Sequence, residues 1–344
     1  MPEEKIYNLL KTVKYPGFSR DIVSFGLVKN IEISDNQVVV ALSISTQNQN
    51  HIDNLKRDIE KVIADNTKIS NVKIEIALQN IKQATEKNQS VQQPIPGVKH
   101  VIAVGSGKGG VGKSTVSINL AAELSKQYKV GVLDLDIYGP SLPMVIGSNE
   151  QPKITEDQKL IPINKYGMKF MSFGFINNQN AATIWRGPMV AKLTTQFFDD
   201  VIWGELDYLI LDLPPGTGDI QLTLVQRLAL SGAIIVTTPQ DLAILDVRKG
   251  ADMFKKVNTP VLGVVENMSQ YICPHCQKES QIFDGKGGFS ESERLEVPLL
   301  AEISISKEIS QSTDSGQPYV LTHTNSKITK QYESMAKKIH ELVS

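Results

Sequence analysis

Cysteine is nearly absent from this chain: two of its 344 residues are cysteine, Cys273 and Cys276, and they stand three positions apart. A pair so close together cannot form the framework of disulfides that joins distant segments of secreted proteins. The start of the chain also lacks the basic residues and the apolar run of an export signal. These absences predict a protein of the reducing cytosol, that is, a cytoplasmic one.

The chain also lacks an excess of charge of one sign and lacks a long hydrophobic run. Its 36 Lys and Arg residues balance 37 Asp and Glu residues, for a net charge of −1. Nucleic acid and anionic membrane surfaces attract strongly basic proteins, so this balance does not favour either partner. No stretch approaches the ~20 apolar residues of a membrane-spanning helix. We therefore expect neither nucleic acid nor a membrane as a partner.

What is present is the composition of an ordinary globular protein, with 41% hydrophobic and 21% charged residues. The length indicates about two domains, and residues 1–82 are predicted to form a small α+β domain. Apolar spacing indicates, in chain order, a helix over 3–13, strands over 25–33 and 37–44, a helix over 51–63 and a strand over 72–77. The polar, proline-containing segment ATEKNQSVQQPIPGV then predicts a linker over 83–98.

Residues 99–344 follow a different pattern, in which short apolar runs rich in valine and isoleucine alternate with segments of helix length. The runs cover 101–104, 130–135, 208–213, 233–237 and 261–265. Strands that are covered on both faces show such continuous apolar runs, whereas strands with one wet face alternate. The pattern predicts an α/β domain with a parallel sheet and helices on both faces.

A glycine-rich segment, GSGKGGVGKST over 105–115, follows the first of these strands and precedes a helix expected over 116–124. It fits the pattern G-x-x-x-x-G-K-[ST], in which backbone N–H groups and the positive end of a helix hold phosphate oxygens. We therefore predict a P-loop NTPase sheet that binds ATP and Mg²⁺, with an accidental glycine-rich turn as the disfavoured alternative. The residues predicted to bind ATP are Gly107, Lys108, Gly109, Gly110, Val111, Gly112, Lys113, Ser114 and Thr115.

The two lysines of this loop carry different expectations. Lys113 would reach the β- and γ-phosphates, and the Ser114 hydroxyl would ligate Mg²⁺. Because exposed loop positions contribute little to a core, alanine at either position should remove activity without unfolding the chain. Lys108 is poorly placed to fold back onto its own nucleotide, since the loop backbone occupies that space. It is better placed to reach a neighbouring chain's phosphates, where positive charge accelerates phosphoryl transfer; a solvated surface lysine is the alternative.

Three carboxylates stand at the ends of predicted strands, where an open parallel sheet presents ligand-binding residues. Asp212 closes an apolar strand and fits the Walker B pattern, in which a carboxylate holds Mg²⁺. Asp134 and Asp136 stand together at the end of the second apolar run. Two acids at a strand end are equally able to cap the next turn or helix, so both roles are open at this point.

The segment YICPHCQK over 271–278 contains both cysteines and permits three interpretations. A redox dithiol usually begins a helix in a thioredoxin-like unit, whereas this pair lies late in the P-loop domain. Structural zinc and an iron–sulfur cluster each require four ligands. His275 lies between the two cysteines in sequence, and all three side chains cannot readily coordinate one ion. One chain therefore supplies two of four thiolates, and a homodimer with the metal on its two-fold axis supplies all four. The same dimer would bring Lys108 to a neighbouring chain's phosphates.

The motifs, taken as an ordered set, resemble one protein family. The loop GKGGVGKST resembles the deviant phosphate loop of the MinD/ParA/nitrogenase-iron-protein group of ATPases. Further motifs resemble one branch of that group, the Mrp (ApbC) family of iron–sulfur cluster carriers. These motifs are LDLDIYGPS at 133–141, WRGPM at 185–189, DLPPGTGD at 212–219, ENM at 266–268 and CPHC at 273–276.

The resemblance implies a catalytic role for particular residues. In that group the lysine that matches Lys108 acts across a nucleotide-sandwich dimer. Asp136 would position the attacking water in switch I, and Asp134 would lie near Mg²⁺. The glycine-containing segment after Asp212 would be switch II, which rearranges when the γ-phosphate is lost.

The resemblance also implies how the base and the thiols are used. Asn267 would recognise adenine, with Pro239 and Gln240 as weaker candidates for lining the same pocket. Cys273 and Cys276 would hold a [4Fe–4S] cluster between two chains, with zinc at the same site as the alternative.

The implied function is that of an ATP-binding carrier, which receives a cluster from a donor or scaffold protein and transfers it to apo-proteins, with slow hydrolysis of ATP. The alternative is a positioning or partition ATPase that cycles on a membrane or on DNA and holds a structural zinc ion at the dimer interface. The balanced charge and the paired cysteines argue against this alternative.

The two ends of the chain carry weaker signals. The first domain resembles a small domain that also occurs alone in iron–sulfur assembly factors, yet it contains no cysteine. We therefore expect it to dock partners or regulate, not to ligate the cluster. The C-terminal stripe consists of Ile328, Tyr332, Met335, Ile339 and Leu342. The mixed charges beside it predict a helix that docks on the sheet, with a membrane-binding helix as the alternative.

Overall fold

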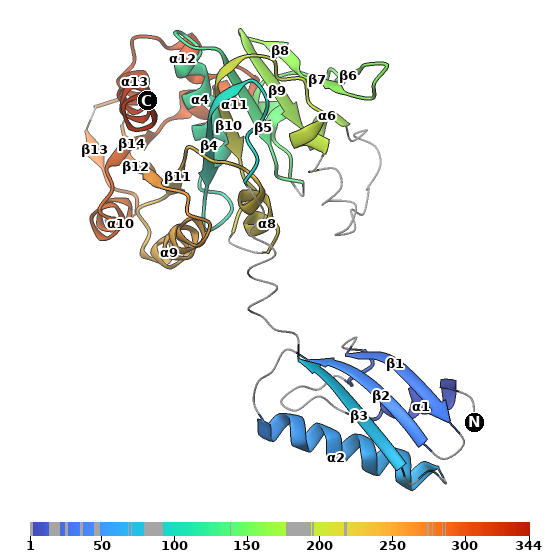
Figure 1. The fold of residues 1–344 in the computed structure, drawn as a ribbon. Helices are drawn as coiled ribbons and strands as arrows, with labels where there is room; N and C mark the ends of the chain where they lie inside the picture. The colour runs from blue at the N-terminus through green and yellow to red at the C-terminus, as the bar shows by residue number, and fades with distance from the viewer. Residues whose placement is uncertain are drawn as a thin grey trace. The chain divides into compact units, whose positions relative to one another are not determined.

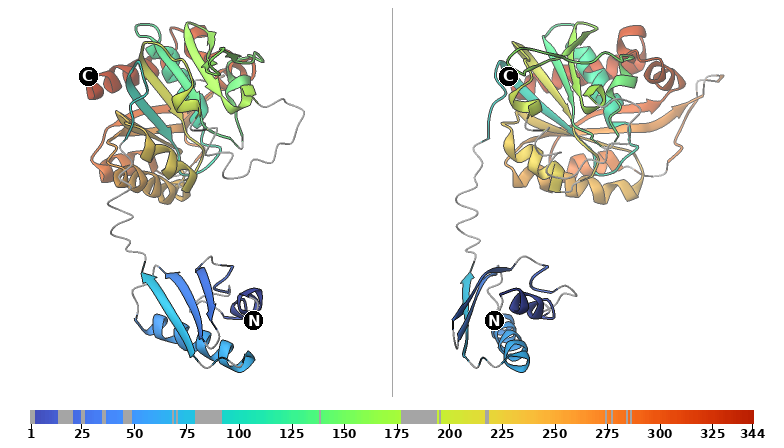
Figure 2. Two further views of the ribbon diagram at one scale, coloured as in Figure 1. Left: turned by 45° about the vertical axis from the view of Figure 1, so that its right-hand side comes forward. Right: turned by 90° about the vertical axis from the view of Figure 1, so that its right-hand side faces the viewer.

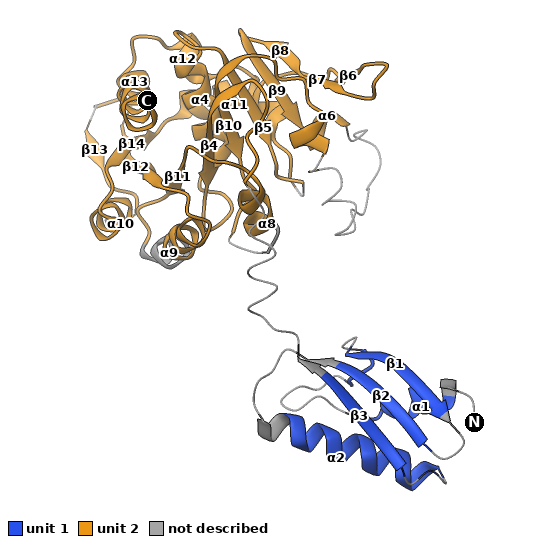
Figure 3. Ribbon diagram, in the orientation of Figure 1, with its two compact units in different colours: residues 1–91 blue, residues 92–344 orange. Residues whose placement is uncertain are grey.

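The computed structural model divides into two compact units, Met1–Val91 and Gln92–Ser344 (Figure 3). The structure describes residues 3–13, 21–24, 27–34, 37–44, 49–67, 69, 71–78, 92–137, 139–176, 194, 196–216, 219–273, 275–276, 278–283, 285 and 287–344. The side-chain amide of Gln92 donates to the carbonyl of Val257 at 3.0 Å, and the N–H of Gln93 donates to the carbonyl of Arg227 at 2.9 Å. Residues 92–98 therefore belong to the larger unit, although the composition predicted them as part of a linker over 83–98.

The smaller unit is a three-stranded sheet with two helices. Its elements are α1 (Glu3–Leu10), β1 (Val28–Ser34), β2 (Gln37–Ile44), α2 (Gln49–Asn66) and β3 (Asn71–Leu78) (Figure 1). Strand β2 pairs antiparallel with β1 and parallel with β3. Alternate residues of β2, such as Val38 and Val40, are buried in one cluster with Ile59 and Ile63 of α2. The predicted small α+β domain is therefore present, with its elements in the predicted order.

The larger unit contains the α/β domain. Its strands are β4 (Val98–Gly105), β5 (Val130–Asp134), β6 (Lys153–Ile154), β7 (Leu160–Ile161), β8 (Ile163–Lys165), β9 (Met168–Ser172), β10 (Leu206–Asp212), β11 (Gly232–Thr237), β12 (Val261–Ile272), β13 (Glu279–Ser280) and β14 (Leu299–Ile305). Its helices are α4 (Lys113–Leu124), α5 (Leu142–Val145), α6 (Phe173–Ile176), α8 (Asp219–Arg227), α9 (Asp241–Lys256), α10 (Gly287–Leu295), α11 (Lys307–Asp314), α12 (Tyr319–Thr322) and α13 (Lys327–Val343). All five apolar runs of the sequence form strands of this unit.

The main sheet has the strand order β13-β12-β11-β4-β10-β5-β9-β8, and β14 also pairs with β12. The pairings from β12 to β9 are parallel, whereas β13 and β8, at the two ends of this order, run antiparallel to their neighbours. The carboxyl ends of β4, β5, β10 and β11 therefore meet along one edge of the sheet. Open parallel sheets bind ligands at this edge.

Helices cover both faces of this sheet (Figure 2). One apolar cluster joins α4 and α13 to the sheet, and a second joins α8 and α9 to the opposite face. In α13, Ile328, Tyr332, Met335 and Ile339 are at most 8% exposed, whereas Leu342 is 50% exposed. The predicted docking of the C-terminal stripe is confirmed for the four buried residues. No helix within the described ranges is long and apolar enough to cross a bilayer.

Candidate nucleotide and thiol sites

The phosphate loop leads from the end of β4 into the first turn of α4. Gly110 and Gly112 have φ angles of +79° and +80°, a conformation that side-chain-bearing residues rarely adopt. A Cβ atom at Gly110 would meet nothing within 4 Å, so the loop is open there. A Cβ atom at Gly112 would collide with the side chain of Asn267. The loop therefore has an open side and a braced side, and α4 begins directly after it at Lys113.

Asn267 provides this brace from strand β12. Its Nδ2 donates to the carbonyl oxygen of Val111 at 2.8 Å, and the residue is 9% exposed. The next residue, Met268, has a φ of +58°, so the strand is locally irregular at this position. The side-chain amide thus ties β12 to the phosphate loop. The contact with adenine that the family resemblance implies stays a prediction.

Lys113 is buried, and the expectation of an exposed loop position is wrong. Its side chain is 7% exposed, and its Nζ lies 2.6 Å from Oδ1 of Asp212, whose side chain is 4% exposed. The hydroxyl of Ser117, one turn further along α4, lies 2.9 Å from the same oxygen. A buried charge is costly unless it is paired and hydrogen-bonded. Loss of Lys113 would therefore leave a buried carboxylate without its cation.

Asp134 and Asp212 are direct neighbours, because the register of β5 and β10 places them opposite each other. One carboxylate oxygen of Asp134 accepts from the N–H of Asp136 at 2.9 Å. The other accepts from the Ser172 hydroxyl at 2.9 Å and from the N–H of Leu142 at 3.3 Å. Burial, followed by the charge of Asp212, raises the pKa of Asp134 to about 7. A cation bound beside these two acids would reduce the repulsion between their charges.

The donors at this edge suit Mg²⁺. Asp134, Asp212 and the hydroxyl of Ser114 are oxygen ligands, the type that Mg²⁺ prefers. Asp136 is half-buried, and its Oδ1 accepts from the N–H of Gly139 at 3.1 Å. Asp136 therefore caps the turn that follows it, which is the alternative role open to an acid at a strand end. Its role with the attacking water stays a prediction.

Lys108 is half-buried and is not a freely solvated lysine. Its Nζ donates to Oε1 of Gln240 of the same chain at 2.9 Å. The hydroxyl of Ser106 donates to the carbonyl of Lys108 at 2.9 Å, and the carbonyl of Ser106 accepts from the N–H of Gly216 at 3.0 Å. Ser106 therefore joins the phosphate loop to the segment predicted as switch II. The action of Lys108 across a dimer stays a prediction.

The cysteines lie in the turn of the hairpin formed by β12 and β13. Tyr271 pairs with Ser280 in this antiparallel ladder, and the N–H of Cys273 donates to the carbonyl of Lys278 at 3.0 Å. The hairpin is the direct continuation of the strand that carries Asn267. One strand therefore contributes to both the predicted nucleotide site and the predicted thiol site.

The two thiols differ in their surroundings. Cys273 is half-buried and Cys276 is exposed. The backbone N–H groups of Cys276 and His275 hydrogen-bond to the sulfur of Cys273, and these bonds lower its pKa. A lower pKa favours the thiolate, which is the metal-binding form. Among the residues that the structure describes, no group of three or more His, Cys, Asp or Glu side chains could hold a metal ion.

The structure brings together the phosphate loop, Asp134, Asp212 and Asn267 and places the thiols in a separate hairpin, while the binding of nucleotide by these residues stays a prediction. Sequence reasoning missed the contacts of Ser117 and Ser172. Ser117 carried a usable signal, because it stands one helical turn after Lys113. Ser172 carried none, because only the pairing of β9 with β5 places it opposite Asp134. The motif WRGPM at 185–189 and the switch II residues 217–218 lie outside the described residues.

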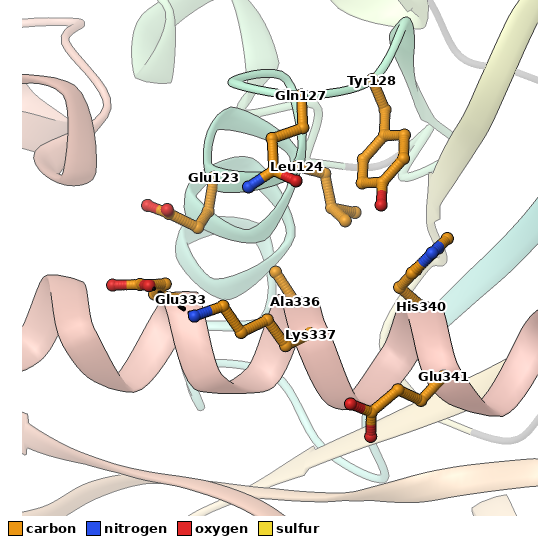
Figure 4. A pocket seen from close by; sticks show the side chains of 9 residues that line it. All are labelled: Glu123, Leu124, Gln127, Tyr128, Glu333, Ala336, Lys337, His340 and Glu341. Atoms are coloured by element: carbon orange, nitrogen blue, oxygen red, sulfur yellow. Dashed lines mark hydrogen bonds and ion pairs between the residues drawn. The ribbon is translucent and has the colours of Figure 1, made fainter.

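A separate pocket of about 160 Å³ lies at the other end of α4, between α4 and α13 (Figure 4). Its charged walls are largely paired: Nζ of Lys337 lies 2.7 Å from Glu333, and Glu123 lies 2.7 Å from the Nζ of Lys126 beside the pocket. Gln127 also lines it. None of the residues predicted for the nucleotide or thiol site lines this pocket.

A parallel sheet with a strand–phosphate loop–helix unit and carboxylates at the ends of neighbouring strands defines a P-loop NTPase. The chain matches the family described as NUBPL iron-transfer P-loop NTPase, of the ParA type, over residues 97–340. Residues 3–76 match the family described as iron–sulfur cluster assembly protein. The chain therefore belongs to the ParA-type family of NUBPL iron-transfer P-loop NTPases, and the family predicted from the motifs is confirmed.

Similar proteins and structures agree with this assignment. An iron–sulfur cluster carrier protein from Helicobacter pylori is 40% identical over 98% of this chain and 92% of its own length. A nucleotide-binding protein from Archaeoglobus fulgidus, solved with ADP, is 37% identical, with a TM-score of 0.58 over 65% of this chain and 89% of that chain. The cell division ATPase MinD from Pyrococcus furiosus shares the fold, with 22% identity and a TM-score of 0.52 over 71% of this chain and 99% of its own.

Proposed function

We propose that this chain is an ATP-binding iron–sulfur cluster carrier. Two copies hold one [4Fe–4S] cluster as cargo, transfer it to apo-proteins, and hydrolyse ATP slowly. The observation that carries the proposal is the pair Cys273 and Cys276 in the turn of the β12–β13 hairpin. One chain offers two thiols, and a cluster held by four thiolates therefore takes its ligands from two copies.

The hairpin suits a cluster that must be both bound and given away. The N–H groups of Cys276 and His275 that hydrogen-bond to the Cys273 sulfur stabilise its thiolate. The exposure of Cys276 keeps the site open to a recipient protein. A structural metal site would be closed on all sides. The open hairpin therefore favours a carrier over a site that holds its metal permanently.

In the proposed nucleotide site, Lys113 would exchange its contact with Asp212 for a contact with the phosphates of ATP. Nζ of Lys113 lies 2.6 Å from Oδ1 of Asp212, and the phosphates of ATP would compete with Asp212 for this lysine. Asp212 would then be free to hold Mg²⁺ together with Ser114. At this position Mg²⁺ would neutralise charge on the phosphates during hydrolysis. Asn267 connects the phosphate loop to the strand that leads into the thiol hairpin, and we propose that this strand couples the two sites.

Anaerobic purification with quantification of iron and sulfide, together with a visible absorption spectrum, tests the cargo. We expect one cluster per two chains in the wild type. The variants Cys273→Ala and Cys276→Ala should each lose iron and sulfide while ATP binding is retained, because the thiols lie outside the phosphate loop. His275→Ala is the matched control in the same turn and should keep the cluster. Tetrathiolate zinc that resists replacement by iron and sulfide would contradict the carrier function.

A further inference from the structure

The contact between Lys108 and Gln240 joins two loops that the sheet places side by side. Strands β4 and β11 are parallel neighbours, Lys108 follows the first, and Gln240 follows the second. The ammonium lies 2.9 Å from the side-chain oxygen of Gln240, and both residues are half-buried. The lysine predicted to serve another chain is therefore held by a neutral acceptor of its own chain.

Gln240 stands at the start of a helix, a position where side chains commonly cap the first turn. It is the N-cap residue of α9, yet its side chain makes no capping hydrogen bond. Helix N-caps favour short side chains such as serine, which accept from the first turn. Ser306 and Ser326 do this at the starts of α11 and α13. The longer side chain of Gln240 reaches Lys108 and does not cap α9.

The backbone at Lys108 is held independently of this contact. The hydroxyl of Ser106 donates to the carbonyl of Lys108, and the carbonyl of Ser106 holds the N–H of Gly216. Rotation of the flexible Lys108 side chain would therefore allow a change of partner while these backbone contacts are kept. The amide oxygen of Gln240 is uncharged, and an ammonium binds an anionic phosphate oxygen more strongly than a neutral acceptor.

We propose that Gln240 is the resting acceptor of Lys108, a positioning residue that holds the lysine until a second nucleotide-loaded copy of this chain offers its phosphates. The proposal rests on the cross-chain role of Lys108 in the proposed function. When two copies meet, Lys108 exchanges the Gln240 oxygen for phosphate oxygens of the other copy, and no covalent bond is changed. The strength of the resting contact thus sets how readily the pair becomes competent to hydrolyse ATP.

Two substitutions at Gln240 should change hydrolysis in opposite directions. In Gln240→Glu, an anionic acceptor competes with phosphate for Lys108, and we expect kcat to fall about fivefold, the scale of one partly exposed ion pair. In Gln240→Ala the resting acceptor is absent, and we expect hydrolysis at low protein concentration to rise about twofold. The affinity for ATP should be unchanged in both variants. The measurement is steady-state ATP hydrolysis over a range of protein concentrations, with ATP affinity by calorimetry.

Gln127→Glu is the matched control, because it introduces the same charge at the opposite end of α4 (Figure 4). It should leave kcat unchanged. In the background Lys108→Ala, which should itself bind ATP without hydrolysing it, Gln240→Glu should have no further effect.

The outcomes separate this proposal from the function on which it rests. If Lys108→Ala abolishes hydrolysis while both Gln240 variants shift it in the same direction or not at all, the resting-acceptor role is wrong and the cross-chain lysine stands. A changed affinity for ATP with unchanged kcat would place Gln240 in the nucleotide pocket and overturn the proposal. Normal hydrolysis by Lys108→Ala would overturn both.

Discussion

At the scale of single residues, the predicted nucleotide site buries one cation and two carboxylates. Lys113 pairs with Asp212, while Asp134 is held by the Ser172 hydroxyl and backbone N–H groups. Such a group is costly to bury, and its members stabilise the fold only as a set. The residues predicted to bind ATP and Mg²⁺ therefore also influence the stability of the fold.

Replacement of Lys113 should reveal this double role. Lys113→Ala leaves the buried Asp212 carboxylate unpaired, and we expect the free energy of unfolding to fall by ~3 kcal/mol, with hydrolysis lost. The double variant Lys113→Ala/Asp212→Asn removes the unpaired charge and should regain most of that stability while staying inactive. Urea unfolding of the nucleotide-free protein measures both effects. Ser114→Ala is the control, since it should lose hydrolysis and keep its stability; an unaltered unfolding curve for Lys113→Ala would refute the prediction.

The raised pKa of Asp134 predicts a pH dependence of stability. Burial and the charge of Asp212 raise this pKa to about 7, whereas an aspartate in the unfolded chain titrates near ~4. Between these values the folded state binds a proton that the unfolded state has released. The free energy of unfolding therefore decreases with rising pH across this window, by at most ~1.4 kcal/mol per pH unit from this group.

Asp134→Asn should remove that slope and should stabilise the protein at about pH 8, where the wild-type carboxylate is ionised. The measurement is urea unfolding without nucleotide or Mg²⁺ at pH values from about 5 to 8. The difference between the variant and the wild type isolates Asp134 from other titrating groups. Two parallel pH profiles would show that this residue does not set the slope.

At the scale of elements, α13 shows how a C-terminal helix is fixed to the sheet. Ser326 caps the helix by accepting from the N–H of Thr329 at 3.0 Å. Tyr332 and Met335 are both fully buried in the cluster that includes α4. The hydroxyl of Tyr332 has no hydrogen-bond partner among the described residues, so this side chain contributes as an apolar ring with an unsatisfied polar atom.

Two substitutions in α13 should therefore differ sharply. Met335→Ala opens a cavity in a packed interface and should lower the free energy of unfolding by ~3 kcal/mol. Tyr332→Phe removes only the unpaired hydroxyl and should leave stability unchanged or raise it by up to ~1 kcal/mol. Thermal or urea unfolding compares the two variants with the wild type. A loss in Tyr332→Phe as large as that in Met335→Ala would mean that the hydroxyl has a stabilising partner.

At the scale of the whole molecule, the chain has two units with separate hydrophobic cores. The core of the smaller unit contains side chains from Ile6 to Ile76, and the clusters of the larger unit begin at Ile95. The phosphate loop, the carboxylates, Gln240 and the thiol hairpin all belong to the larger unit.

This division predicts that a chain starting at Gln92 folds by itself. Its thermal unfolding transition should match that of the larger unit in the full chain, because its apolar clusters are complete. ATP hydrolysis and cluster binding in vitro should be retained. Calorimetry and hydrolysis assays of the full chain and the fragment test the expectation. A fragment that aggregates or melts at a clearly lower temperature would show that the first unit is required for stability.

The sequence-based predictions that the structure confirms concern features formed by residues close together along the chain. Strand–loop–helix order, glycine spacing around the phosphate loop and a run of apolar residues before Asp212 are local properties, and the structure contains each of them. The extra length of β12, which reaches Ile272, was not predicted, because its later residues lack the continuous apolar pattern of Val261–Val265. The start of the larger unit at Gln92 was also missed, because polar residues held by hydrogen bonds resemble a linker in composition.

By itself, the sequence determined the class of fold, the identity of the phosphate loop and the presence of two neighbouring thiols. Each of these follows from patterns of residues close together along the chain. Only the tertiary structure decided what the loop lysines contact: Lys113 lies buried against Asp212, and Lys108 rests on Gln240. It also decided that Asp134 faces Asp212 and Ser172. These contacts arise from the order and register of strands β11, β4, β10, β5 and β9. Strand order depends on packing across the whole sheet, which no local pattern of residues encodes.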